Sequence, residues 1–171
     1  WNLGAEPVNA ANIYRNGLEF SGTTILPSWV AATDRPARFI RKADADANWT
    51  LPTDGSGTQT IGAKYFAKGK NDAGQDIIWG GYILRFDGTF GSNVIVSQTA
   101  SPPVATTPWV EVNIGDSAAE ITALVEDGDN LLIPKTDGIW VYYPDGSQEN
   151  LTPDFEAMAH PDNFRGAFNW N

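Results

Sequence analysis

Few residues of this chain have the side chains that catalysis usually requires. Among its 171 residues there is no cysteine and a single histidine, His160. A Ser-His-Asp hydrolase would depend on His160, but the chain has no Gly-x-Ser-x-Gly elbow to present a nucleophilic serine. A thiolate zinc site and a multi-histidine metal cluster are excluded for lack of ligands. We therefore interpret His160 as structural and expect no catalytic residue.

Acidic side chains at alternating positions are the nearest match to a metal site. The stretch 44–48 supplies the first three oxygen ligands of a calcium loop, but Trp49 replaces the required glycine and Gly55 replaces the bidentate glutamate. An EF-hand is thus excluded. A non-standard Ca²⁺ site stays open there or at the turn 127–130, and no other cofactor is expected. The residues that would hold such an ion are Asp44, Asp46, Asn48, Asp127 and Asp129.

A pair of carboxylates is the other chemistry that the composition allows. A glycoside hydrolase needs two of them about 5 to 9 Å apart across a cleft, and the chain has 21 acidic residues. Most of these residues flank turns, and a compact domain with such frequent turns offers a binding surface more readily than a deep cleft. We therefore interpret the chain as non-enzymatic and keep a glycoside-active enzyme as an alternative.

Aromatic side chains make a stronger case for a binding role. Seven tryptophans and an aromatic content of 12% could supply rings that stack on sugars, while Asp, Asn and Gln bind the hydroxyls. The best stacking candidates are Trp140 and Tyr142, which share one face of a predicted strand, with Lys135 as the cross-strand partner of Trp140. The same pattern also fits a lysine stem packed over a tryptophan, or a subunit contact.

The strand that carries Trp140 belongs to a hairpin predicted at 131–143. An Asp137-Gly138 turn gives a register in which Lys135 lies opposite Trp140. Pro134 cannot donate a ladder hydrogen bond, so we expect its strand at the edge of a sheet. The candidate stacking side chains would then lie near solvent.

A second hairpin, predicted at 77–99, is apolar on both faces. A two-residue turn at Asp87-Gly88 would pair Trp79 with Val96. A strand pair without a polar face is either central between two layers or packed against a neighbouring subunit. The residues that we take as interface candidates are Tyr82, Leu84, Phe86 and Ile95.

Turn dipeptides between short runs of β-branched and aromatic residues define the fold class. Asn-Gly or Asp-Gly pairs occur at 16–17, 54–55, 87–88, 127–128, 137–138 and 145–146. Further strands are predicted at about 18–26, 37–42, 59–66 and 108–114. Short helices are predicted from a capping box at 117–120, from Thr152 to before Pro161 and, as a third candidate, at 7–15. The sequence thus predicts one domain, 1–171: an all-β antiparallel β-sandwich or jelly roll with one or two short helices.

Charge and hydropathy exclude two classes of partner. The 21 acidic and 11 basic residues give a formal net charge of −10, which repels phosphate backbones, so we expect no nucleic-acid partner. Neither a phosphate-binding Gly-rich loop nor a dinucleotide fingerprint occurs. No apolar run approaches the roughly 18 residues of a membrane helix, so no membrane insertion is expected. Because the chain starts at Trp1, it is either a processed chain or a segment of a longer one.

One short segment carries a family resemblance. Residues 49–59, Trp-Thr-Leu-Pro-Thr-Asp-Gly-Ser-Gly-Thr-Gln, resemble a phrase common in bacteriophage tail-fibre and other virion β domains, where a strand ending in Leu-Pro enters an Asp-Gly-Ser turn. The resemblance implies a cysteine-poor, typically trimeric protein that often binds host glycans.

Together these observations predict a non-enzymatic structural or adhesion module of a virion or of the extracellular space. We expect it to form a homo-oligomer, plausibly a trimer, through β-sheet interfaces, and to contact other virion or surface proteins and glycans. The first alternative is a carbohydrate-binding module of a secreted polysaccharide-degrading enzyme. The second is the glycoside-active enzyme with two carboxylates.

Overall fold

The computed structural model describes residues 12–14, 18–20, 22–30, 35–36, 40–43, 61–85, 87–98 and 109–153. The regular secondary structure in these ranges consists of β-strands alone, and every strand pair is antiparallel. The predicted all-β antiparallel β-sandwich is confirmed. The described residues contain no helix that could cross a membrane.

The strands in these ranges form four sheets. The central sheet has the order β10-β9-β8-β7 and consists of β7 (Gly62–Lys70), β8 (Asp76–Leu84), β9 (Phe90–Gln98) and β10 (Val110–Asn113). The C-terminal sheet consists of β11 (Val125–Asp127), β12 (Asn130–Lys135), β13 (Gly138–Tyr142) and β14 (Gln148–Asn150), in that order. The N-terminal sheet consists of β2 (Leu18–Phe20), β3 (Thr23–Leu26) and β6 (Ile40–Ala43). The small sheet consists of β1 (Asn12–Tyr14), β4 (Ser28–Val30) and β5 (Arg35–Pro36).

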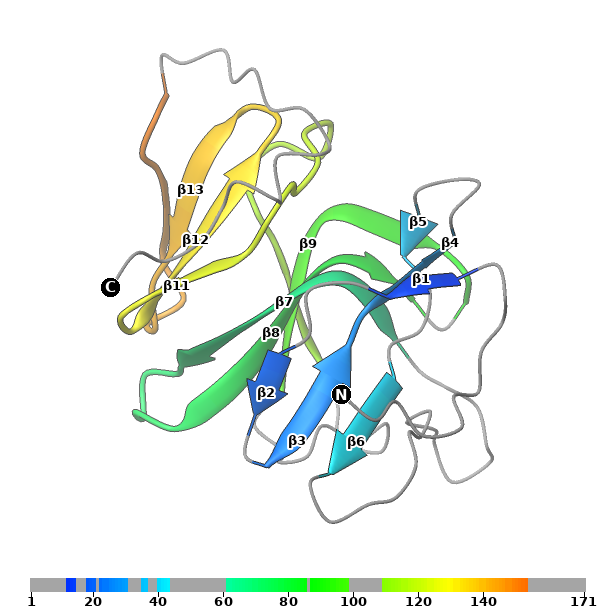
Figure 1. The fold of residues 1–171 in the computed structure, drawn as a ribbon. Coiled ribbons are helices and arrows are strands. Elements are labelled where there is room, and N and C mark those ends of the chain that lie inside the picture. The colour runs from blue at the N-terminus through cyan, green and yellow to red at the C-terminus, as the bar shows by residue number, and fades with distance from the viewer. Residues whose placement is uncertain are drawn as a thin grey trace.

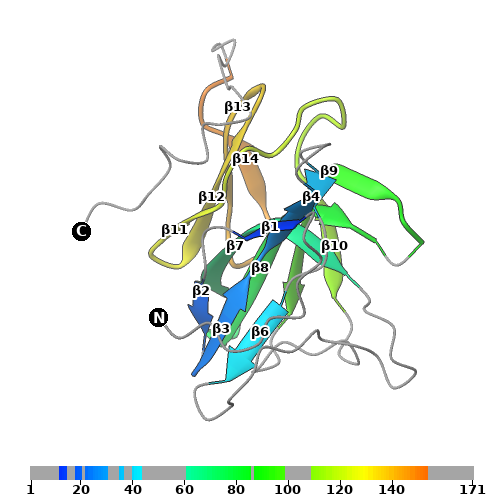
Figure 2. The ribbon, with the colours of Figure 1, turned by 45° about the vertical axis from the view of Figure 1, so that its right-hand side comes forward.

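The central sheet is covered on both faces. Figures 1 and 2 show the C-terminal sheet, yellow to orange, on one side of the green central strands and the N-terminal sheet, blue to cyan, on the other. Trp79 and Ile95 of the central sheet pack with Ile133 in one core, the C-terminal core. A second core, the N-terminal core, joins Ile78 to Ile25 of β3. The apolar character of both faces of the β8–β9 hairpin therefore fits a central position between two layers.

The register of the β8–β9 hairpin differs from the prediction. Leu84 pairs with Phe90 next to the turn, and Trp79 pairs with Ser97 instead of Val96 beyond Tyr82, because the ladder shifts between Gly81 and Ile83. Tyr82 has a φ of 53°, a left-handed conformation that is uncommon for a residue with a side chain. At this bulge the single residue Tyr82 of β8 lies opposite three residues of β9, 92–94, and the side chains on its two sides exchange faces. As a result, Trp79 shares a core with Ile95.

The β12–β13 hairpin also has a register other than the predicted one. Lys135 pairs with Gly138, and Trp140 lies opposite Ile133, a shift of two residues that leaves the faces unchanged. The turn is therefore Thr136-Asp137. The backbone N–H of Thr136 donates to the carbonyl of Glu120 at 2.9 Å. A segment distant in the sequence thus helps to place this turn, which local turn propensity does not encode.

The prediction that Pro134 marks an edge strand is wrong. Its strand β12 has β11 on one side and β13 on the other. The ladder with β11 covers only Asn130 to Leu132, so it has ended before Pro134. Beyond that point the carbonyl of Pro134 accepts a hydrogen bond from the N–H of Thr122 at 2.8 Å. A proline is tolerated in this central strand because its missing N–H is not required there.

The short helix predicted from the capping box at 117–120 is also wrong. The segment is a turn that continues in extended form, and Ile121 forms a bridge with Lys135. The backbone N–H of Ile121 donates to Ser92 of the central sheet, and that of Thr122 donates to the C-terminal sheet. Hydrogen bonds to two sheets outweigh the local helical signal. Of the other helix candidates, 12–14 form β1, while 7–11 and the residues after 153 lie outside the described ranges.

Two hairpin turns should make the fold sensitive to acid. Hydrogen bonds from Thr89 lower the pKa of Asp87, and hydrogen bonds from Ser147 lower the pKa of Asp145. A lowered pKa in the folded state contributes stability above the unfolded pKa, and this stability is lost as the pH falls. We expect the Tm to fall between about pH 5 and pH 2, and to fall less in the Asp87→Asn/Asp145→Asn variant, because asparagine keeps the acceptor but does not titrate. Thermal denaturation, monitored by circular dichroism, would measure the Tm at each pH. If the Tm fell equally with pH in the wild-type protein and in the variant, the prediction would be contradicted.

Candidate functional site

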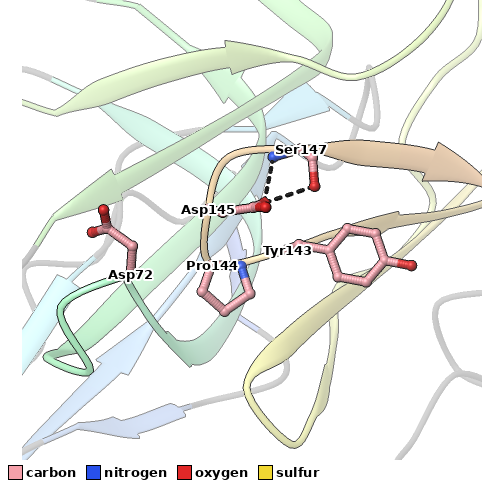
Figure 3. A pocket seen from close by; sticks show the side chains of 5 residues that line it. All are labelled: Asp72, Tyr143, Pro144, Asp145 and Ser147. Carbon is pink, nitrogen blue, oxygen red and sulfur yellow. Dashed lines mark hydrogen bonds between the residues drawn. The ribbon is translucent and has the colours of Figure 1, made fainter.

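Two hairpin turns from different sheets line an open hollow on the surface of the protein. The β7–β8 turn contributes Asp72, and the β13–β14 turn contributes Tyr143, Pro144, Asp145 and Ser147. Figure 3 shows Pro144 between Asp72 and Tyr143, with Asp145 next to Ser147. The hollow is open to solvent and has a volume of about 550 Å³. It therefore combines two carboxylates and a hydroxyl with an aromatic and a proline ring.

The β7–β8 turn is held by the side chain of Asn71. Its Oδ1 accepts hydrogen bonds from the backbone N–H of Ala73 at 3.1 Å and of Gln75 at 2.9 Å. The N–H of Gly74 donates to the Asn71 carbonyl at 2.9 Å. Asparagine favours this arrangement because its short side chain mimics a backbone turn. Asp72 is thereby placed at the tip, exposed and without a hydrogen bond to any other described residue.

The β13–β14 turn is held in the same manner by Asp145. Its Oδ1 accepts from the backbone N–H of Ser147 at 2.9 Å and from the Ser147 hydroxyl at 2.6 Å. These hydrogen bonds, that from the hydroxyl first, lower the pKa of Asp145 and keep it ionised at neutral pH. Within the described part of the chain, the second oxygen of Asp145, Oδ2, accepts no hydrogen bond.

Tyr143 closes one end of the hollow. Its hydroxyl donates to Oε2 of Glu149 at 3.2 Å, which fixes the direction of the ring. Partial burial raises the pKa of Tyr143, and the hydrogen bond to the Glu149 carboxylate raises it further. The phenol therefore stays protonated and acts as a hydrogen-bond donor.

Of the predicted stacking patch, Lys135 lies inside the protein. Lys135 is 1% exposed, and its Nζ donates to the carbonyls of Ile114 at 2.5 Å and Asp116 at 2.9 Å. The carboxylate of Asp137 is 3.7 Å away, and the Nζ lies 5.4 Å from the centre of the Trp140 ring. Burial lowers the pKa of Lys135, although Asp137 counteracts this effect. Lys135 thus serves the fold and is not available to a ligand at the surface.

The two aromatic stacking candidates are also used internally. Trp140 and Tyr142 are half-buried and pack against the C-terminal core. Gly115 lies so close to the indole of Trp140 that no other residue type fits there without a shift. The Tyr142 ring meets Trp79 edge-on, with ring centroids 5.1 Å apart. Among the three interpretations that the sequence allowed for this pattern, the arrangement of Lys135 and Trp140 matches a lysine packed over a tryptophan.

The interface candidates near the bulge differ in how deeply they are buried. Ile95 is fully buried in the C-terminal core, so it does not lie on a surface that a second copy could contact. Tyr82 and Leu84 are partly buried, and Tyr82 packs against the same core. Phe86 lies outside the described residues.

The proposed calcium ligands are only partly covered by the structure. Asp127 and Asp129 lie on the exposed turn between β11 and β12. The described residues contain no group of three or more His, Cys, Asp or Glu side chains that could hold a metal ion. Asp44, Asp46 and Asn48 lie outside these residues, as does His160.

The sequence identified one wall of the hollow as a turn but did not assign it a function. The Pro-Asp-Gly-Ser turn at 144–147 is evident from its residue types, and the Asn71-Asp72 pair is a similar signal. Nothing in the sequence shows that these two turns lie side by side, because they belong to different sheets.

Comparison with known proteins identifies no relative for this β-sandwich. No protein-family model, no curated protein and no solved structure matches the chain. The site is therefore interpreted from its own chemistry.

The contact between Gly115 and Trp140 should be visible in the stability of alanine variants. Gly115 and Gly74 both have a positive φ, 53° and 72°, but a Cβ at Gly74 has open space whereas one at Gly115 meets the indole of Trp140. Both variants should lose about 1–2 kcal/mol for the backbone conformation. Gly115→Ala should lose about 1–3 kcal/mol more, because the site is overpacked. Urea denaturation would measure both, and equal losses would show that the close contact is not important.

Removal of the buried ammonium group should be costly. In Lys135→Met the side-chain stem is kept, but the carbonyls of Ile114 and Asp116 lose their donor. We expect the free energy of unfolding to fall by about 1–3 kcal/mol. Lys70→Met is the matched control, because Lys70 forms an ion pair with Asp76 that is exposed to solvent and should contribute much less to stability. If Lys70→Met were as unstable as Lys135→Met, the loss of stability could not be attributed to the buried hydrogen bonds of Lys135.

Proposed function

We propose that this chain is a non-enzymatic structural and adhesion module of a virion or of an extracellular surface, and that it assembles with further copies of itself. The observation that supports assembly best is an apolar patch on the side of the C-terminal sheet that faces away from the central sheet. This outer patch consists of Leu132, Pro134, Ile139 and Leu151.

The outer patch follows from the register of the C-terminal sheet. Pro134 lies opposite Ile139, and the N–H of Leu151 donates to the Ile139 carbonyl at 2.8 Å, so the three side chains are neighbours on one face. Ile139 is 41% exposed and Leu151 48% exposed. Leu132 and Pro134 are half-buried, and Val141, opposite Leu132, is 3% exposed, so the exposed part of the patch is formed by Ile139 and Leu151. Exposed apolar side chains side by side on a sheet are typical of an interaction surface.

A second copy of the chain is the occupant that the charge favours. With a net charge of −10, two copies repel each other over most of their surfaces. Two like-charged copies repel each other least where an apolar patch of one meets an apolar patch of the other. The same patch on each copy can form such a contact, because a two-fold symmetric interface pairs identical surfaces. Assembly through this face would also cover the exposed apolar side chains.

The use of the acidic side chains supports a non-enzymatic role. In the described turns, Asp87, Asp116 and Asp145 each accept a hydrogen bond from a backbone N–H two residues further along. Carboxylates used in this way stabilise turns, and turns at the end of a rigid sandwich present a surface to a partner. The hollow at Tyr143 also favours the runner-up, a monomeric carbohydrate-binding module of a secreted enzyme.

The oligomeric state distinguishes these two functions. We expect size-exclusion chromatography with light scattering to give a mass that is a multiple of 18.5 kDa. Ile139→Asp/Leu151→Asp should shift the protein to the monomer, because it introduces two like charges into the contact. Val110→Asp is the control, since Val110 is a 60% exposed apolar residue on another sheet. A monomeric wild-type protein, or dissociation of the control to the same extent, would reject assembly through the outer patch.

A further inference from the structure

We infer that the hollow between the β7–β8 and β13–β14 turns binds a neutral sugar ring. This inference deepens the adhesion role proposed above and rests on it, because it names the chemical class of the ligand and the residues that contact it. The hollow is formed by Asp72, Tyr143, Pro144, Asp145 and Ser147.

The polar groups of the hollow favour a ligand that donates hydrogen bonds. Both oxygens of Asp72 and the Oδ2 of Asp145 accept no hydrogen bond from another described residue. The hydroxyl of Ser147 is already committed as a donor to Asp145. Acceptors thus exceed donors, and a ligand with several hydroxyl groups would satisfy them with charge-assisted hydrogen bonds.

The apolar groups of the hollow require that the same ligand has a carbon face. Figure 3 shows the Pro144 ring between Asp72 and Tyr143, and the Tyr143 ring points away from Asp72. The electron-rich face of an aromatic ring attracts polarised C–H groups, and a sugar ring presents such groups on one side and hydroxyls at its rim. A bare metal ion has no carbon face, and the described residues hold no group of three metal-binding side chains.

The turns that carry these groups are rigid before a ligand arrives. Asn71 holds one turn through two backbone N–H groups, and Asp145 holds the other through Ser147. A preorganised site loses little entropy on binding. The volume of about 550 Å³ lies within the usual range for ligand sites. Because the hollow is open, it would contact only one face of a sugar ring. We therefore expect weak binding, with a dissociation constant of about 1 mM.

The test is an NMR titration of the full chain that follows the backbone amides of Asp72, Asp145 and Ser147. The probes are methyl glucoside, methyl galactoside and N-acetylglucosamine, with calcium chloride and tetralysine in separate titrations. We expect at least one sugar to shift these amides in a saturable manner. A response to calcium or to tetralysine without a response to any sugar, or no response at all, would overturn the inference.

Matched variants assign the response to the hollow. Asp72→Ala removes a side chain without a partner among the described residues, and Asp145→Asn keeps the turn acceptor but replaces the free oxygen with a donor. Each should weaken sugar binding about tenfold, which corresponds to about 1.4 kcal/mol. Asp87→Asn is the control, because Asp87 bonds Thr89 at 2.9 and 2.7 Å just as Asp145 bonds Ser147. Unchanged binding in Asp72→Ala, or equal weakening in the control, would reject the site.

The oligomeric state of the same samples separates this inference from the proposed function. An intact oligomer that responds to no sugar rejects the sugar site alone. A monomer whose amides at the hollow respond to sugar rejects assembly and retains the site.

Discussion

The ammonium group of Lys135 makes the contact on which the packing of the C-terminal sheet depends. It lies under the indole of Trp140 and donates to two carbonyls of the segment that follows β10. Gln148 of β14 binds the same segment, since it accepts from the N–H of Gly115 and donates to the carbonyl of Asn113. Without the Lys135 donor, the buried carbonyl of Ile114 would lose its side-chain partner, which is costly in an apolar environment.

The bulge at Tyr82 is the second constraint, because it determines which side chains of β8 and β9 enter which core. Beyond the bulge the side chains change faces, so Ile83 lies in the N-terminal core while Tyr82 packs against the C-terminal core. The central sheet can therefore be apolar on both sides and still be covered within one chain. Among the described residues, large apolar side chains remain exposed on the outer side of the C-terminal sheet, Ile139 and Leu151, and on the central sheet, Phe90 and Val110.

Local signals predicted the strands and turns well but not their registers. The Asp-Gly turn at 87–88 and the alternation of apolar residues correctly indicated the β8–β9 hairpin, yet no residue pattern indicated that Tyr82 would lie opposite three residues of β9. The capping box at 117–120 predicted a helix because propensity considers only neighbours in sequence, whereas Ile121 and Thr122 bond to two different sheets. The burial of Lys135 has the same cause: Trp140 and Lys135 share a face as predicted, but the segment after β10 packs on that face.

By itself, the sequence determined that this chain is an antiparallel β protein with tight Asp-Gly turns, because turn chemistry and alternation of apolar residues act over a few neighbouring positions. It also determined one wall of the candidate sugar site, since Asp145 holds its own turn. Only the tertiary structure decided that this turn lies beside the β7–β8 turn, and that Lys135 is buried. Both depend on how sheets far apart in the sequence pack, and packing is set by the shape and hydrogen-bonding needs of the whole core.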